Sequence, residues 1–124
     1  MSNDRIALGK KGEETAVKYL KKKRYRIIER NFRCRQGEID IIALHQRSTV
    51  FIEVKTRTDD SFGLPQEAVD YRKQKQIIRC ARNYIKYKRL PEEGRFRFDV
   101  VGVDVCGKKP VVTLIPDAFQ EEGR

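Results

Sequence analysis

Two short apolar stretches separated by four polar residues constrain the fold of this chain more than any other feature. Residues 38–44 and 49–56 are strand-sized and rich in Ile, Val and Phe, and the polar run His45-Gln46-Arg47-Ser48 between them is typical of a turn. Strands this apolar belong to the middle of a sheet rather than to its edge. We therefore expect a β-hairpin at the centre of the sheet.

The register of this hairpin brings charged residues together. A turn centred between Gln46 and Arg47 places Asp40 opposite Glu53 and Glu38 opposite Lys55. Directly opposed residues share one face of the sheet, with their Cβ atoms about 5 Å apart. A two-residue and a four-residue loop give the same register, whereas an odd loop length or a bulge shifts it.

Two opposed carboxylates destabilise a sheet unless a cation separates them. Mg²⁺ prefers one or two carboxylates together with water and phosphate, so Asp40 and Glu53 form a candidate metal site. Lys55 projects to the same face as Glu53, where an ammonium can assist an attacking water. The alternative is that Glu53 and Lys55 form a weak surface pair, but charges in such apolar strands are costly unless they are paired or bind metal.

The remaining pattern predicts one α/β domain over residues 1–124, which is close to the commonest domain size. Gly9 and Gly12 weaken the first helix where close backbone packing is needed. The expected order is helix, three strands, helix, two strands, with a mixed five-stranded sheet. The expected elements are a helix from Asn3 or Asp4 to about Lys23, strands over 25–32, 38–44 and 49–56, a loop over 59–65, a helix from about Gln66 or Asp70 to Tyr87, and strands over 97–105 and 111–115.

Composition narrows the classes of partner. A net charge of +10 favours polyanions such as nucleic acid, although a charge of this kind can also serve solubility alone. No apolar stretch is long enough for a membrane span, and the polar N-terminus carries no secretory signal, so we expect a cytoplasmic protein with no membrane partner. Three widely spaced cysteines and one histidine do not indicate zinc or disulfides, and we expect each cysteine to be a buried or half-buried apolar residue.

Several motifs carry a resemblance along the whole chain. In order, they are Gly9-x-x-Gly12-Glu13-x-x-Ala16-x-x-Tyr19-Leu20, Asn31, Gly37-Glu38-Ile39-Asp40, Phe51-Ile52-Glu53-Val54-Lys55-x-Arg57, Lys73-Gln74 with Ala81 and Tyr84, Arg97-Phe98-Asp99-Val100-Val101 and Asp117-Ala118-Phe119. The chain resembles the YraN family of small bacterial proteins. That family is similar to the archaeal Holliday junction resolvases within the restriction-endonuclease-like (tRNA-endonuclease-like) superfamily.

The resemblance implies a restriction-endonuclease-like fold with a PD-(D/E)xK-type site. In such a site Glu13, Asp40 and Glu53 bind Mg²⁺ (or Mn²⁺), and Lys55 assists the attacking water. The superfamily's proline before the aspartate is absent, since Ile39 occupies that position. The resemblance further implies a homodimer, because a DNA junction is two-fold symmetric, and the second helix is a candidate surface.

The residues around this core site have two interpretations each. Arg57 is expected to hold a phosphate because it lies near the site, with an exposed residue at a strand end as the alternative. Lys73 and Gln74 are candidate nucleic-acid contacts, with a solvated helix face as the alternative. Asp99 is expected to form a structural ion pair, with Arg97 or a helix end, and His45 is expected to be an ordinary turn residue. Tyr25, Phe32, Tyr84 and Phe98 are expected in the core.

The leading hypothesis is therefore a metal-dependent endonuclease that acts on DNA rather than RNA, on branched or damaged structures. The second is a non-catalytic nucleic-acid-binding module that keeps the nuclease fold. A third is a subunit that binds an acidic protein.

Overall fold

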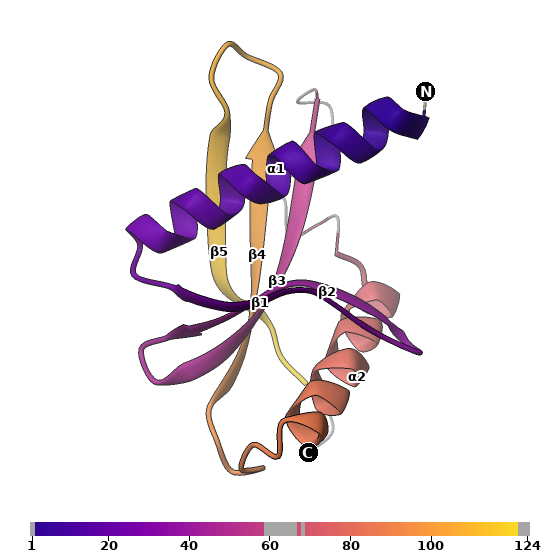
Figure 1. The fold of residues 1–124 in the computed structure, drawn as a ribbon, viewed down its shortest axis with the longest axis vertical. Coiled ribbons are helices and arrows are strands. Elements are labelled where there is room, and N and C mark those ends of the chain that lie inside the picture. Colours follow the sequence, from indigo (N-terminus) through magenta and orange to yellow (C-terminus); the bar gives the residue numbers. More distant parts are fainter. Residues whose placement is uncertain (1, 59–66, 68, 122–124) are drawn as a thin grey trace.

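A computed structural model shows one mixed sheet with a helix on each face (Figure 1), and it describes residues 2–58, 67 and 69–121. The strands lie in the order β1-β2-β3-β4-β5; β3 and β4 are parallel and the other neighbours are antiparallel. The elements are α1 (Ser2–Lys22), β1 (Arg26–Cys34), β2 (Gly37–His45), β3 (Ser48–Arg57), α2 (Tyr71–Tyr87), β4 (Phe96–Asp104) and β5 (Val111–Phe119). This αβββαββ order is that of the restriction-endonuclease-like fold, as expected.

Apolar side chains point alternately to the two faces of the central strands and form two separate cores, one on each face of the sheet. Phe51 and its neighbours on one face of β3 pack with the buried side of α2, whereas Val50 and Ile52 on the other face pack with α1. A crossover through α2 returns the chain parallel to β3, which is the usual role of a helix between parallel strands. Tyr25 is buried in the core on the α1 side, Tyr84 and Phe98 are buried in the core on the α2 side, and Phe32 packs half-buried against the latter, which confirms their expected place in the core.

Gly12 lets α1 approach the sheet closely. A Cβ atom at this position would lie 1.9 Å from Oγ1 of Thr56 on β3, whereas a Cβ at Gly9 would meet nothing within 4 Å. The expectation of close packing is therefore confirmed at Gly12 and is wrong at Gly9, which is exposed. The contact fixes the height of the next residue, Glu13, above the sheet.

The last strand continues beyond the expected end at Ile115. Pro116, the next residue, has no N–H to donate to a neighbouring strand, which is typical of a strand end. β5 is an edge strand, however, where proline is tolerated. The pairing with β4 shifts between Phe98 and Val100, and in this bulge the N–H of Asp117 donates to Oδ1 of Asp99 at 2.9 Å. β5 then resumes its pairing as far as Phe119.

Asp99 is the centre of a buried polar network. Its carboxylate, fully shielded from solvent, pairs with Nε of Arg97 at 2.9 Å and accepts a hydrogen bond from the Tyr25 hydroxyl at 2.7 Å. The expected ion pair of Asp99 with Arg97 is thus confirmed. His45 is more than an ordinary turn residue, because its ring stacks on Tyr25 with centroids 3.9 Å apart and its Nδ1 lies 2.9 Å from the Arg97 guanidinium.

The cysteines differ in exposure. Cys80 is buried and Cys34 is half-buried, as expected, but Cys106 is exposed because it lies in the turn between β4 and β5. None of the three forms a disulfide. Neither of the two helices in the described part of the chain is long and apolar enough to cross a bilayer. The expected loop over 59–65 lies outside the described residues.

Candidate functional site at the fork between β2 and β3

The predicted hairpin register is confirmed, but the two strands separate at the acidic pair. Five register pairs run from His45 opposite Ser48 to Ile41 opposite Ile52, and the ladder then ends. Asp40 and Glu53 would be the next pair. Instead of standing across from Glu53, the Asp40 carboxylate accepts a hydrogen bond from the N–H of Val54, with 2.8 Å between N and Oδ2. Asp40 thus occupies the fork where β2 leaves β3.

Glu53 reaches the fork from the face of the sheet that α2 covers. Its side chain is only 5% exposed, and a buried carboxylate requires partners. Two ammonium groups provide them: Nζ of Lys55 lies 3.6 Å from Oε2 of Glu53, and Nζ of Lys73 lies 3.7 Å from the same oxygen. Lys55 was expected beside Glu53, whereas the contact with Lys73 comes from the first turn of α2.

The N-terminus of α2 explains how Lys73 arrives there. Asp70 caps the helix, and its Oδ1 accepts a hydrogen bond from the N–H of Lys73 at 2.9 Å. Gln74 donates from Nε2 to the carbonyl of Val69 at 3.0 Å. Lys73 and Gln74 were the two predicted nucleic-acid contacts on α2. Lys73 contacts Glu53, and Gln74 forms a hydrogen bond with the segment that precedes the helix.

The buried and charged surroundings of the fork shift the pKa of Asp40. Burial, together with the nearby negative charge of Glu53, raises the pKa of Asp40 to about 8, and Glu13 adds a smaller effect in the same direction. The hydrogen bond from Val54 opposes this shift by stabilising the charged form. A carboxyl group of raised pKa next to a second carboxylate is the pattern that a bound cation would relieve.

Glu13 approaches the fork from the opposite side of the sheet. Its Oε1 accepts hydrogen bonds from Nε of Arg30 at 3.0 Å and from Nδ2 of Asn31 at 3.1 Å. Glu13, Asn31 and Asp40 line an open depression of about 480 Å³ between α1 and the ends of β2 and β3. The sequence alone did not indicate a role for Asn31. Its backbone is left-handed, with φ of 54°, a conformation that asparagine adopts more readily than most residues.

Two expected neighbours of the site have positions of their own, and Glu38 also lines the depression beside Asp40. Glu38 was predicted opposite Lys55, but the ladder between β2 and β3 ends before that position, and Glu38 instead pairs with Arg33 of β1 at 3.4 Å. Arg57 follows Lys55 on the same face of β3 and stands opposite Asp104 of β4 in the parallel ladder.

The donor set at the fork suits a hard divalent cation held by few protein ligands. Among the described residues, no three carboxylate, histidine or cysteine side chains lie close enough to hold one ion together. Mg²⁺ commonly takes only one or two carboxylates and keeps several waters. Asp40 and Glu53 match that requirement, and Glu13 lines the Asp40 side of the fork, where it can bind an ion's water.

The fold and the fork define a class, namely small restriction-endonuclease-like α/β proteins with an acidic–lysine motif at the point where two central strands separate. A profile of Uncharacterised protein family UPF0102 matches residues 12–103, and the chain belongs to that family.

Close relatives extend this match over nearly the whole chain. A UPF0102 protein from Geobacter metallireducens is 47% identical over 120 residues, which cover 97% of this chain and 98% of the relative. A UPF0102 protein from Clostridium botulinum is also 47% identical, with 91% of this chain and 94% of the relative covered. A third, from Caldanaerobacter subterraneus, is 49% identical over 77% of this chain and 78% of its own length.

Proposed function

We propose that this protein is a Mg²⁺- or Mn²⁺-dependent endonuclease of the cytoplasm that hydrolyses phosphodiester bonds in DNA. The observation that carries the proposal is the convergence of Asp40, Glu53 and Lys55 at the fork between β2 and β3. Glu53 is almost fully buried, Asp40 has a raised pKa, and Lys55 lies within ion-pair distance of Glu53. Branched and damaged DNA are the substrates that the resemblance to resolvases favours.

Each residue has a distinct task in this proposal. Asp40 and Glu53 hold the cation, and Asp40 loses its proton when it does so. A divalent cation at this position supplies charge neutralisation for a phosphate and lowers the pKa of a water molecule. Lys55 orients the attacking water and stabilises negative charge on the phosphate. The hydrogen bond from Val54 fixes the Asp40 carboxylate, so the acceptor is already oriented before a cation or substrate arrives.

A non-catalytic nucleic-acid-binding module is the second candidate. The specific observation in its favour is that Lys55 and Lys73 both contact Glu53, so this buried carboxylate is compensated without a metal. Calorimetric titration with Mn²⁺ separates the two candidates. The nuclease proposal predicts a binding heat that Glu53→Gln removes. Salt-sensitive DNA binding in the absence of any metal binding would favour the module.

Cleavage of a panel of duplex, flap and four-way-junction DNAs tests the nuclease proposal itself. Wild type is expected to cut at least one of these substrates in Mg²⁺ or Mn²⁺ and none in EDTA. Lys55→Ala is expected to bind the same substrate with little change and to cleave it at least 100-fold more slowly, as loss of a group acting on the transition state requires. Equal nicking by wild type and Lys55→Ala would show that the activity comes from a contaminant or another site.

A further inference from the structure

A row of five basic side chains follows the solvent side of α2. The row, here called the basic stripe, consists of Arg72, Lys75, Arg79, Arg82 and Lys86, all of which are exposed. Their spacing alternates between three and four residues, which keeps them on one face of an α-helix. With 1.5 Å of rise per residue, the stripe is about 21 Å long.

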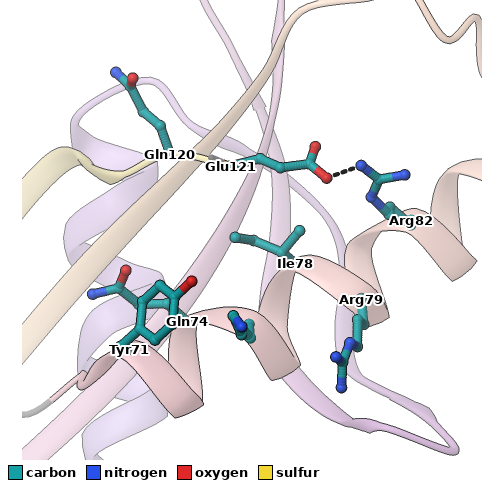
Figure 2. A pocket seen from close by; sticks show the side chains of 8 residues that line it. Tyr71, Gln74, Ile78, Arg79, Arg82, Gln120 and Glu121 are labelled. Carbon is teal, nitrogen blue, oxygen red and sulfur yellow. Dashed lines mark ion pairs between the residues drawn. The ribbon is translucent and has the colours of Figure 1, made fainter. Parts of the chain in front are cut away.

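Among the residues that the structure describes, almost nothing balances this charge. The helix contains no Asp or Glu between Tyr71 and Tyr87. In the described part of the chain only one member of the stripe has an ion pair, namely Arg82 with Glu121, which reaches it from the segment after β5 (Figure 2). Like charges at such spacing destabilise a helix, so the stripe costs stability unless an anionic partner covers it.

The stripe begins in the helical turn that contacts the fork, on the solvent side of that turn. Lys73, in the first turn of α2, is in contact with Glu53, and Arg72 and Lys75 flank it in the sequence. From there the helix runs away from the fork along the sheet (Figure 1). A ligand lying on the stripe would therefore extend along the solvent side of α2 from the end of the helix that contacts Glu53.

We infer that the basic stripe of α2 binds the phosphate backbone of a nucleic-acid duplex, the substrate of the proposed nuclease. The inference rests on the proposed function and adds the surface that holds the substrate. One strand of a duplex carries a phosphate about every 3.4 Å along the axis, so about 21 Å of duplex axis contains about six phosphates of each strand. Five cations in that length match the charge of such a backbone closely.

Two other partners fit the stripe less well. An anionic membrane would be entered by apolar residues of an amphipathic helix, but the apolar residues Ile77, Cys80 and Ala81 are buried against the sheet. A symmetric dimer through α2 would place the stripes of two copies together, since a two-fold interface uses the same surface twice. Two rows of like charge would then repel each other.

Salt-dependent binding to a labelled duplex tests the inference. The triple variant Lys75→Gln/Arg79→Gln/Lys86→Gln neutralises the stripe, and Lys21→Gln/Lys108→Gln/Lys109→Gln removes the same charge from exposed positions elsewhere. Loss of three phosphate contacts should reduce the slope of log K against log[salt] by about 2.7 and weaken binding at 0.15 M salt on the order of 100-fold. The control triple should change the slope by less than about 1.

The outcomes separate this inference from the nuclease proposal. A selective loss in the stripe variant supports the inference, even if wild type cuts no DNA and the nuclease proposal fails. Equal losses of affinity in both triple variants would overturn the inference. Tighter binding of wild type to anionic vesicles than to a DNA or RNA duplex would also overturn it. Neither result would affect the nuclease proposal. A change of oligomeric state in the stripe variant, measured by sedimentation, would overturn the inference in favour of a dimer surface.

Discussion

Gly12→Ala is the substitution that most sharply tests how α1 is seated on the sheet. The new Cβ would lie 1.9 Å from Oγ1 of Thr56 and 3.0 Å from its Cβ and Cγ2. Rotation of the Thr56 side chain about χ1 moves Oγ1 and Cγ2 but leaves Cβ in place. It therefore cannot relieve all three contacts. α1 must therefore move away from β3, and overpacking of this kind costs about 1–3 kcal/mol.

Gly9→Ala in the same helix is the matched control. Nothing lies within 4 Å of a Cβ at Gly9, so this variant should gain about 1 kcal/mol in helix propensity. The same gain applies to Gly12→Ala and cancels in the comparison. The free energy of unfolding of Gly12→Ala should therefore be about 1–3 kcal/mol lower than that of Gly9→Ala.

Thermal unfolding followed by circular dichroism measures the difference. For a chain of this size about 1 kcal/mol corresponds to roughly 4 °C in Tm, so the two variants should differ by about 4–12 °C. Adding Thr56→Ala removes Oγ1 and Cγ2 and should recover part of the loss in Gly12→Ala. Equal Tm values for the two glycine variants would refute the close approach of α1 to β3, and with it the seating of Glu13.

Two further predictions concern buried charge. Arg97→Met should lower the free energy of unfolding by about 3–5 kcal/mol, because it leaves the buried Asp99 carboxylate without its cation; urea denaturation measures this, and a loss below about 1 kcal/mol would contradict the network. Because the folded-state pKa of Asp40 is raised to about 8, folding stability should fall as pH rises from about 4 to about 8. The Tm advantage of Asp40→Asn over wild type should therefore grow across that window in metal-free buffer, and a constant difference would be inconsistent with the raised pKa.

The parts of this structure that depend on local pattern could be predicted from the sequence. The polar turn at 45–48 and the apolar strands on either side determined the hairpin register, which the structure confirms over five pairs. The crossover through α2 followed from the length of the helical segment between strands. The same pattern gave the order of all seven elements, and the resemblance to a known family added the restriction-endonuclease-like fold.

What could not be predicted depends on contacts between distant segments. Register alone does not say where two strands separate, so the hydrogen bond from Val54 to Asp40 and the pairing of Glu38 with Arg33 were missed. Lys73 looked like a solvated helix residue because its partner, Glu53, lies 20 positions earlier on a different element. His45 looked unremarkable in a turn for the same reason, since the Arg97 guanidinium comes from β4.

The single-turnover cleavage rate of Glu53→Gln tests the central claim most directly. The variant keeps the size of the buried side chain and removes the charge needed to hold a cation. Glu29→Gln is the control, since Glu29 lies on β1, pairs with Lys88 and does not line the depression beside Asp40. With the best cleaved DNA of the panel and saturating Mn²⁺, Glu53→Gln should be at least 100-fold slower than wild type and Glu29→Gln within about threefold. A Glu53→Gln rate equal to that of wild type would contradict the assignment of the fork between β2 and β3 as a nuclease centre.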